Sequence, residues 1–179
     1  MSPRDLDHLN AALLIFRVAI GVVFLAHGYN HIFRGGKIKG TAGWFESLGM
    51  RPGIVHAWVA SLTELGAGAL LILGFAMPLA GAGVVGTMLV AFVTNHKKNG
   101  FFIFRPGEGY EYVMTLIACG FALATIGPGE WGLDHKVFNG DHLRIFNDLT
   151  GATGLVVAFF AGAGGAALLL ATCWRPNKK

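Results

Sequence analysis

The sequence predicts an all-α membrane protein. Of its 179 residues 54% are apolar and only 13% are charged, whereas soluble domains carry about 25% charged residues. The apolar residues gather in five runs, each near the roughly 20 residues that a helix needs to cross a bilayer. Because lipid offers the backbone no hydrogen bonds, such runs must be helices. They cover residues 9–28, 55–73, 78–94, 110–126 and 151–174.

We expect residues 1–134 to form a four-helix transmembrane bundle and residues 135–179 to add a loop, a fifth transmembrane helix (151–174) and a basic tail. Gly74 predicts the end of the second helix and Pro78 the start of the third, so these two should form an antiparallel hairpin. The run 110–126 is near the minimum spanning length. Small residues at four-residue spacing in the fifth run favour close packing.

Shorter features complete the expected organisation. The N-terminal segment lacks a basic n-region, so the first run is interpreted as an uncleaved span. The segment 43–50 (GWFESLGM) suits a short interfacial helix, and 136–149 (KVFNGDHLRIFNDL) an amphipathic surface helix. Both cysteines, Cys119 and Cys173, belong to apolar runs and indicate no disulfide framework.

The basic residues of the loops predict an orientation. With five spans, ten Lys and Arg residues fall on one side and three on the other. The positive-inside rule then puts the N-terminus outside and the C-terminus in the cytoplasm of a bacterial plasma membrane. The net charge of +4 is carried by loops and tail and indicates no nucleic-acid partner. The oligomeric state is left open, a homo-oligomer included.

Two charges within apolar runs form the first candidate constellation. Arg17 lies in the first run and Glu64 near the middle of the second. An ionisable residue inside a bilayer costs a few kcal/mol or more unless it is paired, which makes it a functional-site hypothesis by default. Each residue shares a helix face with small residues, so we expect an intramembrane ion pair between Arg17 and Glu64. A purely structural pair that fixes helix register is the alternative.

A second group of ionisable residues lies at the helix ends that face the basic loops. These residues are His27, His31, His56, His96 and Glu111, with Asn95 and Asn99 nearby. Histidine titrates near neutral pH and hydrogen-bonds through either ring nitrogen. Each one alone is more readily explained as an interfacial hydrogen-bonding residue, and the spacing of His27 and His31 is too weak a signal to predict a metal. Glu111 either favours the dipole of its helix or faces inward toward His27 and His96.

Six motifs in order resemble the DoxX family of small bacterial membrane proteins. They are RVxxGxxFxxHG at 17–28, GWFESLGM at 43–50, TELGAG at 63–68, NHKKNG at 95–100, GYEY at 109–112 and GPGEWGLD at 127–134. The resemblance implies a four-helix membrane core, to which the fifth helix is an addition. The family includes the large subunit of a thiosulfate:quinone oxidoreductase, and a mycobacterial member is tied to a membrane complex for thiol and oxidative-stress homeostasis.

The resemblance and the clustering together suggest a membrane oxidoreductase-type subunit that interacts with a quinone or with a thiol or sulfur redox partner. In this hypothesis His27 and His96 donate hydrogen bonds and protons to the quinone, and Glu111 orients or recharges a histidine. Phe24 packs against the ring, Arg17 holds the deeper carbonyl, and the site is completed by His31, His56 and Asn99. The alternative is a non-catalytic membrane anchor that recruits soluble redox enzymes through its basic loops.

Overall fold

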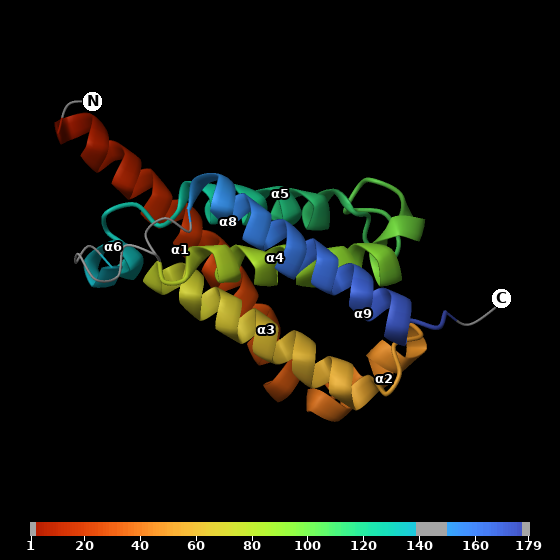
Figure 1. The fold of residues 1–179 in the computed structure, drawn as a ribbon. Helices are drawn as coiled ribbons and strands as arrows, with labels where there is room; N and C mark the ends of the chain where they lie inside the picture. The colour runs from red at the N-terminus through yellow and green to blue at the C-terminus, as the bar shows by residue number, and fades with distance from the viewer. Residues whose placement is uncertain (1–2, 139–149, 177–179) are drawn as a thin grey trace.

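The computed structural model describes residues 3–138 and 150–176, and both parts are built of helices (Figure 1). The predicted all-α class is confirmed. The α-helices are α1 (Pro3–Phe33), α2 (Lys37–Ser47), α3 (Gly53–Leu73), α4 (Met77–Ala91), α5 (Glu111–Ile126), α6 (Leu133–Phe138), α8 (Gly151–Val157) and α9 (Gly165–Cys173). Two π-helical turns, η1 (Phe92–His96) and η3 (Ala158–Gly164), and one 3₁₀ turn, η2 (Lys97–Asn99), join or extend them.

Four of the described helices are long and apolar enough to cross a membrane. They are Arg4–Phe33, Gly53–Leu73, Met77–Asn99 and Gly151–Cys173. The last one matches the predicted fifth helix. Helix α5 has 16 residues and is about 24 Å long at 1.5 Å per residue, which is less than the hydrocarbon core of about 30 Å. The chain is therefore a multi-pass membrane protein, whereas the count of five crossings stays a prediction.

The long helices pack in two groups that diverge toward one end. Helix α1 packs along α3, and α2 covers the end of that pair. In the other group α4 lies between α5 and the C-terminal helix formed by α8, η3 and α9. Helices α3 and α4 connect the groups through a tight turn, while α1 and α5 hardly touch (Figure 1). Because the two groups diverge, residues of both groups line a common cavity.

Glycines set the close approach of α1 and α3. A Cβ atom on Gly21 would lie 2.8 Å from the Gly68 carbonyl oxygen, and one on Gly28 would lie 2.9 Å from the Ser61 carbonyl oxygen. Such distances leave no room for a side chain, so the two backbones touch. This is how small residues hold helices together in lipid, where burial of apolar surface gives no driving force.

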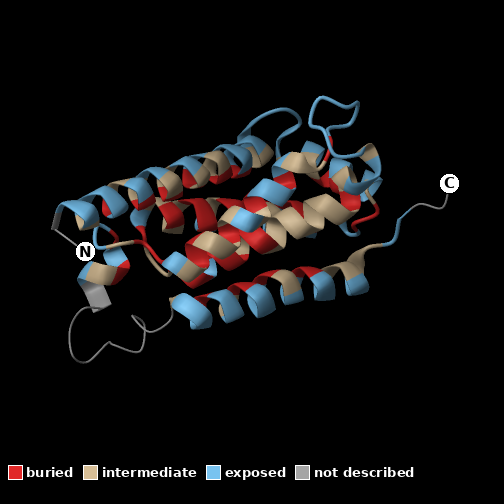
Figure 2. Cartoon of the chain, turned by 90° about the horizontal axis from the view of Figure 1, so that it is seen from above, coloured by how far each residue is buried: buried red, intermediate tan, exposed pale blue. Residues whose placement is uncertain are grey.

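The outer faces of the bundle are apolar. Buried residues face the interior, and the outward faces of the long helices are exposed (Figure 2). Ile15, Leu62, Phe160 and Leu168 are each more than half exposed. A soluble monomer rarely exposes so much contiguous apolar surface, so these faces fit contact with lipid.

Some predicted boundaries differ from the structure. Helix α1 extends five residues beyond the predicted end at residue 28, because Tyr29–Phe33 continue the helix without a glycine or proline to stop it. Helix α2 begins at Lys37 rather than residue 43. Of the predicted surface helix 136–149, only the first residues are described, as the end of α6; the remainder lies outside the described residues. The division at residue 134 stays a prediction.

Candidate functional site

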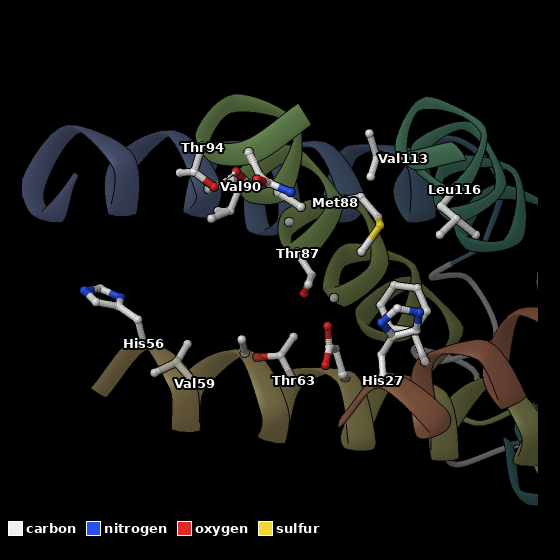
Figure 3. Close-up of a pocket in the computed structure, with 18 of the residues that line it drawn as sticks. His27, His56, Val59, Thr63, Thr87, Met88, Val90, Thr94, Val113 and Leu116 are labelled. Atoms are coloured by element: carbon white, nitrogen blue, oxygen red, sulfur yellow. Dashed lines mark hydrogen bonds between the residues drawn. The ribbon is translucent and has the colours of Figure 1, made fainter. Parts of the chain in front are cut away.

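A cavity of about 520 Å³ lies between the two helix groups at the end where α2 and the C-terminus lie. Its volume is within the range of roughly 300–1,000 Å³ that is usual for small-molecule sites. The close-up shows α3 residues His56, Val59 and Thr63 on one side and α4 residues on the other (Figure 3). Most lining side chains are apolar. The polar ones that line it are His27, His31, His56, Thr63, Glu64, Thr87, Thr94, Asn95, His96, Glu108 and Tyr112.

The buried acid of the cavity is Glu64, and the ionisable residue next to it is His31. The carboxylate is only 4% exposed, and Glu64 Oε2 lies 3.1 Å from His31 Nδ1. The two atoms are within ion-pair distance but lack the alignment of a hydrogen bond. His31 Nδ1 and Glu64 Oε2 therefore both retain hydrogen-bonding capacity.

His56 supplies a second buried polar atom two turns along α3. The residue is 5% exposed, and its Nε2 has no hydrogen-bond partner among the described residues. Its ring lies near Phe45 of α2, with 6.5 Å between centroids. A buried polar atom without a partner costs about 1–3 kcal/mol, so a ligand that bonds to Nε2 recovers that cost.

His27 and Phe24 come from α1 on the side that faces α5. Phe24 is buried, with 1% exposure, whereas His27 is exposed and lines the rim. The sequence placed both residues on the binding site, and both line the cavity (Figure 3). Tyr112, Val113 and Leu116 of α5 line the same cavity.

His96 lines the cavity, but its loop already holds its ring. Its Nδ1 donates a hydrogen bond of 2.9 Å to the Glu108 carbonyl oxygen, which leaves Nε2 as the acceptor in the neutral ring. The amide nitrogen of Asn95 lies 3.4 Å from that Nε2. The free proton that the sequence hypothesis assigned to His96 is thus committed to the backbone.

Asn99 and Glu111 belong to the predicted site, but neither lines the cavity. The Asn99 amide donates to the carbonyl oxygens of Asn95 (3.2 Å), Gly107 and Glu108 (3.0 Å). Glu111 Oε1 accepts a hydrogen bond of 3.0 Å from the Ile103 backbone N–H. Both side chains satisfy the backbone of the loop between η2 and α5, which explains them structurally.

The predicted Arg17–Glu64 ion pair is wrong. Arg17 is 2% exposed, and its guanidinium donates to the carbonyl oxygens of Leu71 (3.1 Å), Ile72 and Trp131 (3.0 Å). The contacts of Gly21 and Gly28 set an antiparallel register in which Arg17 faces the C-terminal end of α3. Glu64 lies about eight residues, or roughly 12 Å, further along that helix. The prediction assumed that the two apolar runs align at their centres, and they do not.

Arg17 instead organises the far end of the bundle. The last carbonyls of a helix lack partners and carry partial negative charge, which a buried cation neutralises. In the segment 127–134, Trp131 takes one guanidinium bond, and Asp134 accepts from the N–H groups of Ala76 (2.7 Å) and Met77 (3.1 Å) at the start of α4. The GPGEWGLD motif is therefore a structural clamp on the α3–α4 turn.

Sequence reasoning missed the threonines and the wall from the C-terminal helix. Thr63 and Thr87 point into the cavity from α3 and α4 (Figure 3). The small-residue stripe of the fifth run, with Gly162 and Ala166, packs on α4 and lines the cavity. The four-residue spacing had signalled close packing, but nothing in the sequence indicated what the stripe enclosed. Among the described residues no group of three His, Cys, Asp or Glu side chains could hold a metal ion.

The fold and the cavity define a helical, multi-pass membrane protein whose bundle encloses a mostly apolar cavity. Residues 12–97 match the family model DoxX, so this part of the chain is a DoxX domain. The match covers most of α1 and all of α2, α3 and α4 through η1, so α5 and the C-terminal helix, which complete the cavity, lie beyond it. Neither the curated proteins nor the solved structures contain a significant match to the chain.

Proposed function

We propose that the chain is a membrane-embedded redox subunit whose cavity binds a quinone or a similar apolar molecule with carbonyl groups. The observation that carries this proposal is the pairing of a mostly apolar cavity of about 520 Å³ with buried polar atoms that lack hydrogen-bond partners, His56 Nε2 and Glu64 Oε2. Apolar walls with a few placed polar groups are the usual composition of a small-molecule site. The residues present therefore fit such a ligand.

Each polar residue has a role that follows from its place. His56 Nε2, when protonated, donates to a carbonyl oxygen at the α2 end of the cavity. His31 Nδ1 and Glu64 Oε2, 3.1 Å apart, are both close enough to exchange a proton with each other and with a ligand in the cavity. Phe24 offers an apolar contact to a flat ring, and His27 stands at the rim where protons reach the pair. A bound quinone would supply a two-electron, two-proton acceptor for a thiol or sulfur partner.

The alternative function is a membrane anchor that recruits soluble redox enzymes. The observation that favours it is the exposed basic residues at the cavity end, with Lys97, Lys98 and Arg105 in one loop. Such a protein would need the bundle but not the polar cavity. The two functions therefore differ in whether buried cavity residues affect ligand binding.

Binding of a short-chain quinone to the purified protein in detergent separates the two functions. We expect saturable binding by equilibrium dialysis and quinone in the organic extract of the purified protein. Glu64→Gln and His56→Phe should each weaken binding about tenfold, because one lost hydrogen bond to a buried group is worth about 1–2 kcal/mol.

His8→Ala is the matched control, since His8 is an exposed histidine near the far end of α1. Glu111→Gln is a second control, because that carboxylate holds a loop outside the cavity. Absence of binding by the folded wild-type protein, together with a stoichiometric soluble partner in the preparation, would leave the anchor as the function.

A further inference from the structure

The loop between η2 and α5 presents apolar side chains outward. Phe101, Phe102 and Ile103 are 40–48% exposed, and Phe104 is 80% exposed. The Phe102 and Phe104 rings stack with centroids 5.1 Å apart. In water such a patch would be unfavourable and would mark an interaction site.

The loop is held in shape by its own hydrogen bonds. The backbone N–H groups of Gly109, Tyr110 and Glu111 donate to the carbonyl oxygens of Phe102, Gly100 and Phe101 at 2.9–3.1 Å. In addition, the Asn99 amide donates to the Glu108 carbonyl oxygen, and the Glu111 carboxylate accepts from the Ile103 N–H. The apolar side chains are thus presented by an ordered backbone, so little conformational entropy is lost when they are buried.

Three cations flank this patch. Lys97, Lys98 and Arg105 are exposed, and none of them forms an ion pair with any residue that the structure describes. Long basic side chains place their charge beyond the apolar surface that their stems cover. The combination is an apolar tip flanked by three cations that have no ion-pair partner among the described residues.

The loop also cannot lie far from the bilayer. It follows directly on the candidate span Met77–Asn99 and ends where α5 begins at Glu111. Its backbone bonds draw the connection together, so the phenylalanines stay near the helix ends. At that depth aromatic rings favour the boundary of headgroups and acyl chains, and cations favour lipid phosphates.

We propose that the basic–aromatic loop, residues 97–105, is a binding site for anionic phospholipid. The phenylalanine side chains enter the acyl boundary of the same membrane, and Lys97, Lys98 and Arg105 bind the headgroup phosphate. The preference for anionic over zwitterionic lipid should be roughly fivefold for each cation, because each Lys or Arg near a charged surface contributes about 1 kcal/mol. The argument for this site does not rest on the quinone proposal, although Ile103 also lines the cavity.

The test reconstitutes the protein in vesicles of phosphatidylcholine with or without phosphatidylglycerol. Phe104→Cys, with Cys119→Ala and Cys173→Ala, carries an environment-sensitive fluorophore, and spin-labelled lipids quench it. We expect an apolar emission spectrum and stronger quenching by spin-labelled phosphatidylglycerol than by spin-labelled phosphatidylcholine. The same label at Asp7, an exposed position of the first turns of α1, is the water-exposed control.

Charge removal completes the test. Lys97→Gln, Lys98→Gln and Arg105→Gln together should abolish the preference for phosphatidylglycerol while the label stays in lipid, whereas Arg4→Gln should leave the preference unchanged. A water-exposed label in both kinds of vesicle overturns the proposal. The loop would then be a binding surface for a soluble partner. A buried label with no dependence on lipid charge overturns the anionic site.

Discussion

Replacement of Arg17 by Leu should be among the most damaging single changes to this bundle. Leucine has about the same number of apolar atoms as the stem of the arginine side chain. The bonds from the two terminal guanidinium nitrogens to the Leu71, Ile72 and Trp131 carbonyl oxygens are lost. A hydrogen bond from a charged donor is worth about 1.5–3 kcal/mol. Two such donors predict a loss of about 3–6 kcal/mol in the free energy of unfolding, measured by denaturation in mixed detergent.

The loss in the free energy of unfolding for Arg17→Lys should lie between zero and the loss for Arg17→Leu. A single ammonium group lacks the planar fork of the guanidinium, so it cannot bond both to the end of α3 and to the 127–134 segment. A loss below about 1 kcal/mol for Arg17→Leu would contradict the clamp, since it would mean that the freed carbonyls cost little.

A double-mutant cycle decides between the clamp and an ion pair. Glu64 lies about two turns of α3 away from the helix end that Arg17 contacts. The losses in the free energy of unfolding caused by Arg17→Leu and Glu64→Leu should therefore add within ~0.5 kcal/mol. A coupling energy well above 1 kcal/mol would show that the two residues interact and would refute the assignment of Glu64 to His31.

Three further changes, one of them with a matched control, test the contacts that hold the helices together. Gly68→Ala should cost about 1–3 kcal/mol, because its Cβ would meet the backbone of α1, whereas Gly66→Ala, which meets nothing within 4 Å, should be neutral or slightly stabilising in the same unfolding assay. Asp134→Ala should cost about 0.5–2 kcal/mol through loss of the N-terminal cap of α4. Trp174→Phe should remove the 2.9 Å bond from the indole N–H to the Leu48 carbonyl oxygen and speed hydrogen exchange at the end of α9.

The helices could be predicted from the sequence because lipid imposes one rule on every apolar run. The starts and ends of α3 and α5 and the extent of the C-terminal helix follow from hydropathy together with Gly74 and Gly127. The extension of α1 to Phe33 could not be predicted in this way, because its last turn is polar enough to resemble a loop.

The candidate site was predictable only in part, and the reason is register. Hydropathy gives the length of each helix but not how far one slides along another, so two charges near the centres of their runs looked like partners. The glycine contacts between α1 and α3 set an offset between the two helices. With this offset Glu64 lies beside His31, and Arg17 lies beside the end of α3. The histidines were correctly predicted to gather at one end of the bundle. That grouping depends only on whether each helix runs up or down, and an offset between helices does not change it.

The most direct test of a ligand site in this cavity is to map the residues that a photoreactive quinone analogue labels in the membrane-embedded protein. We expect cross-linked peptides from α3 between His56 and Glu64 and from α4 and η1 between Thr87 and Thr94, competed away by unlabelled quinone. Labelling confined to the lipid-facing side chains, such as Leu62 or Phe160, and insensitive to competitor would contradict it.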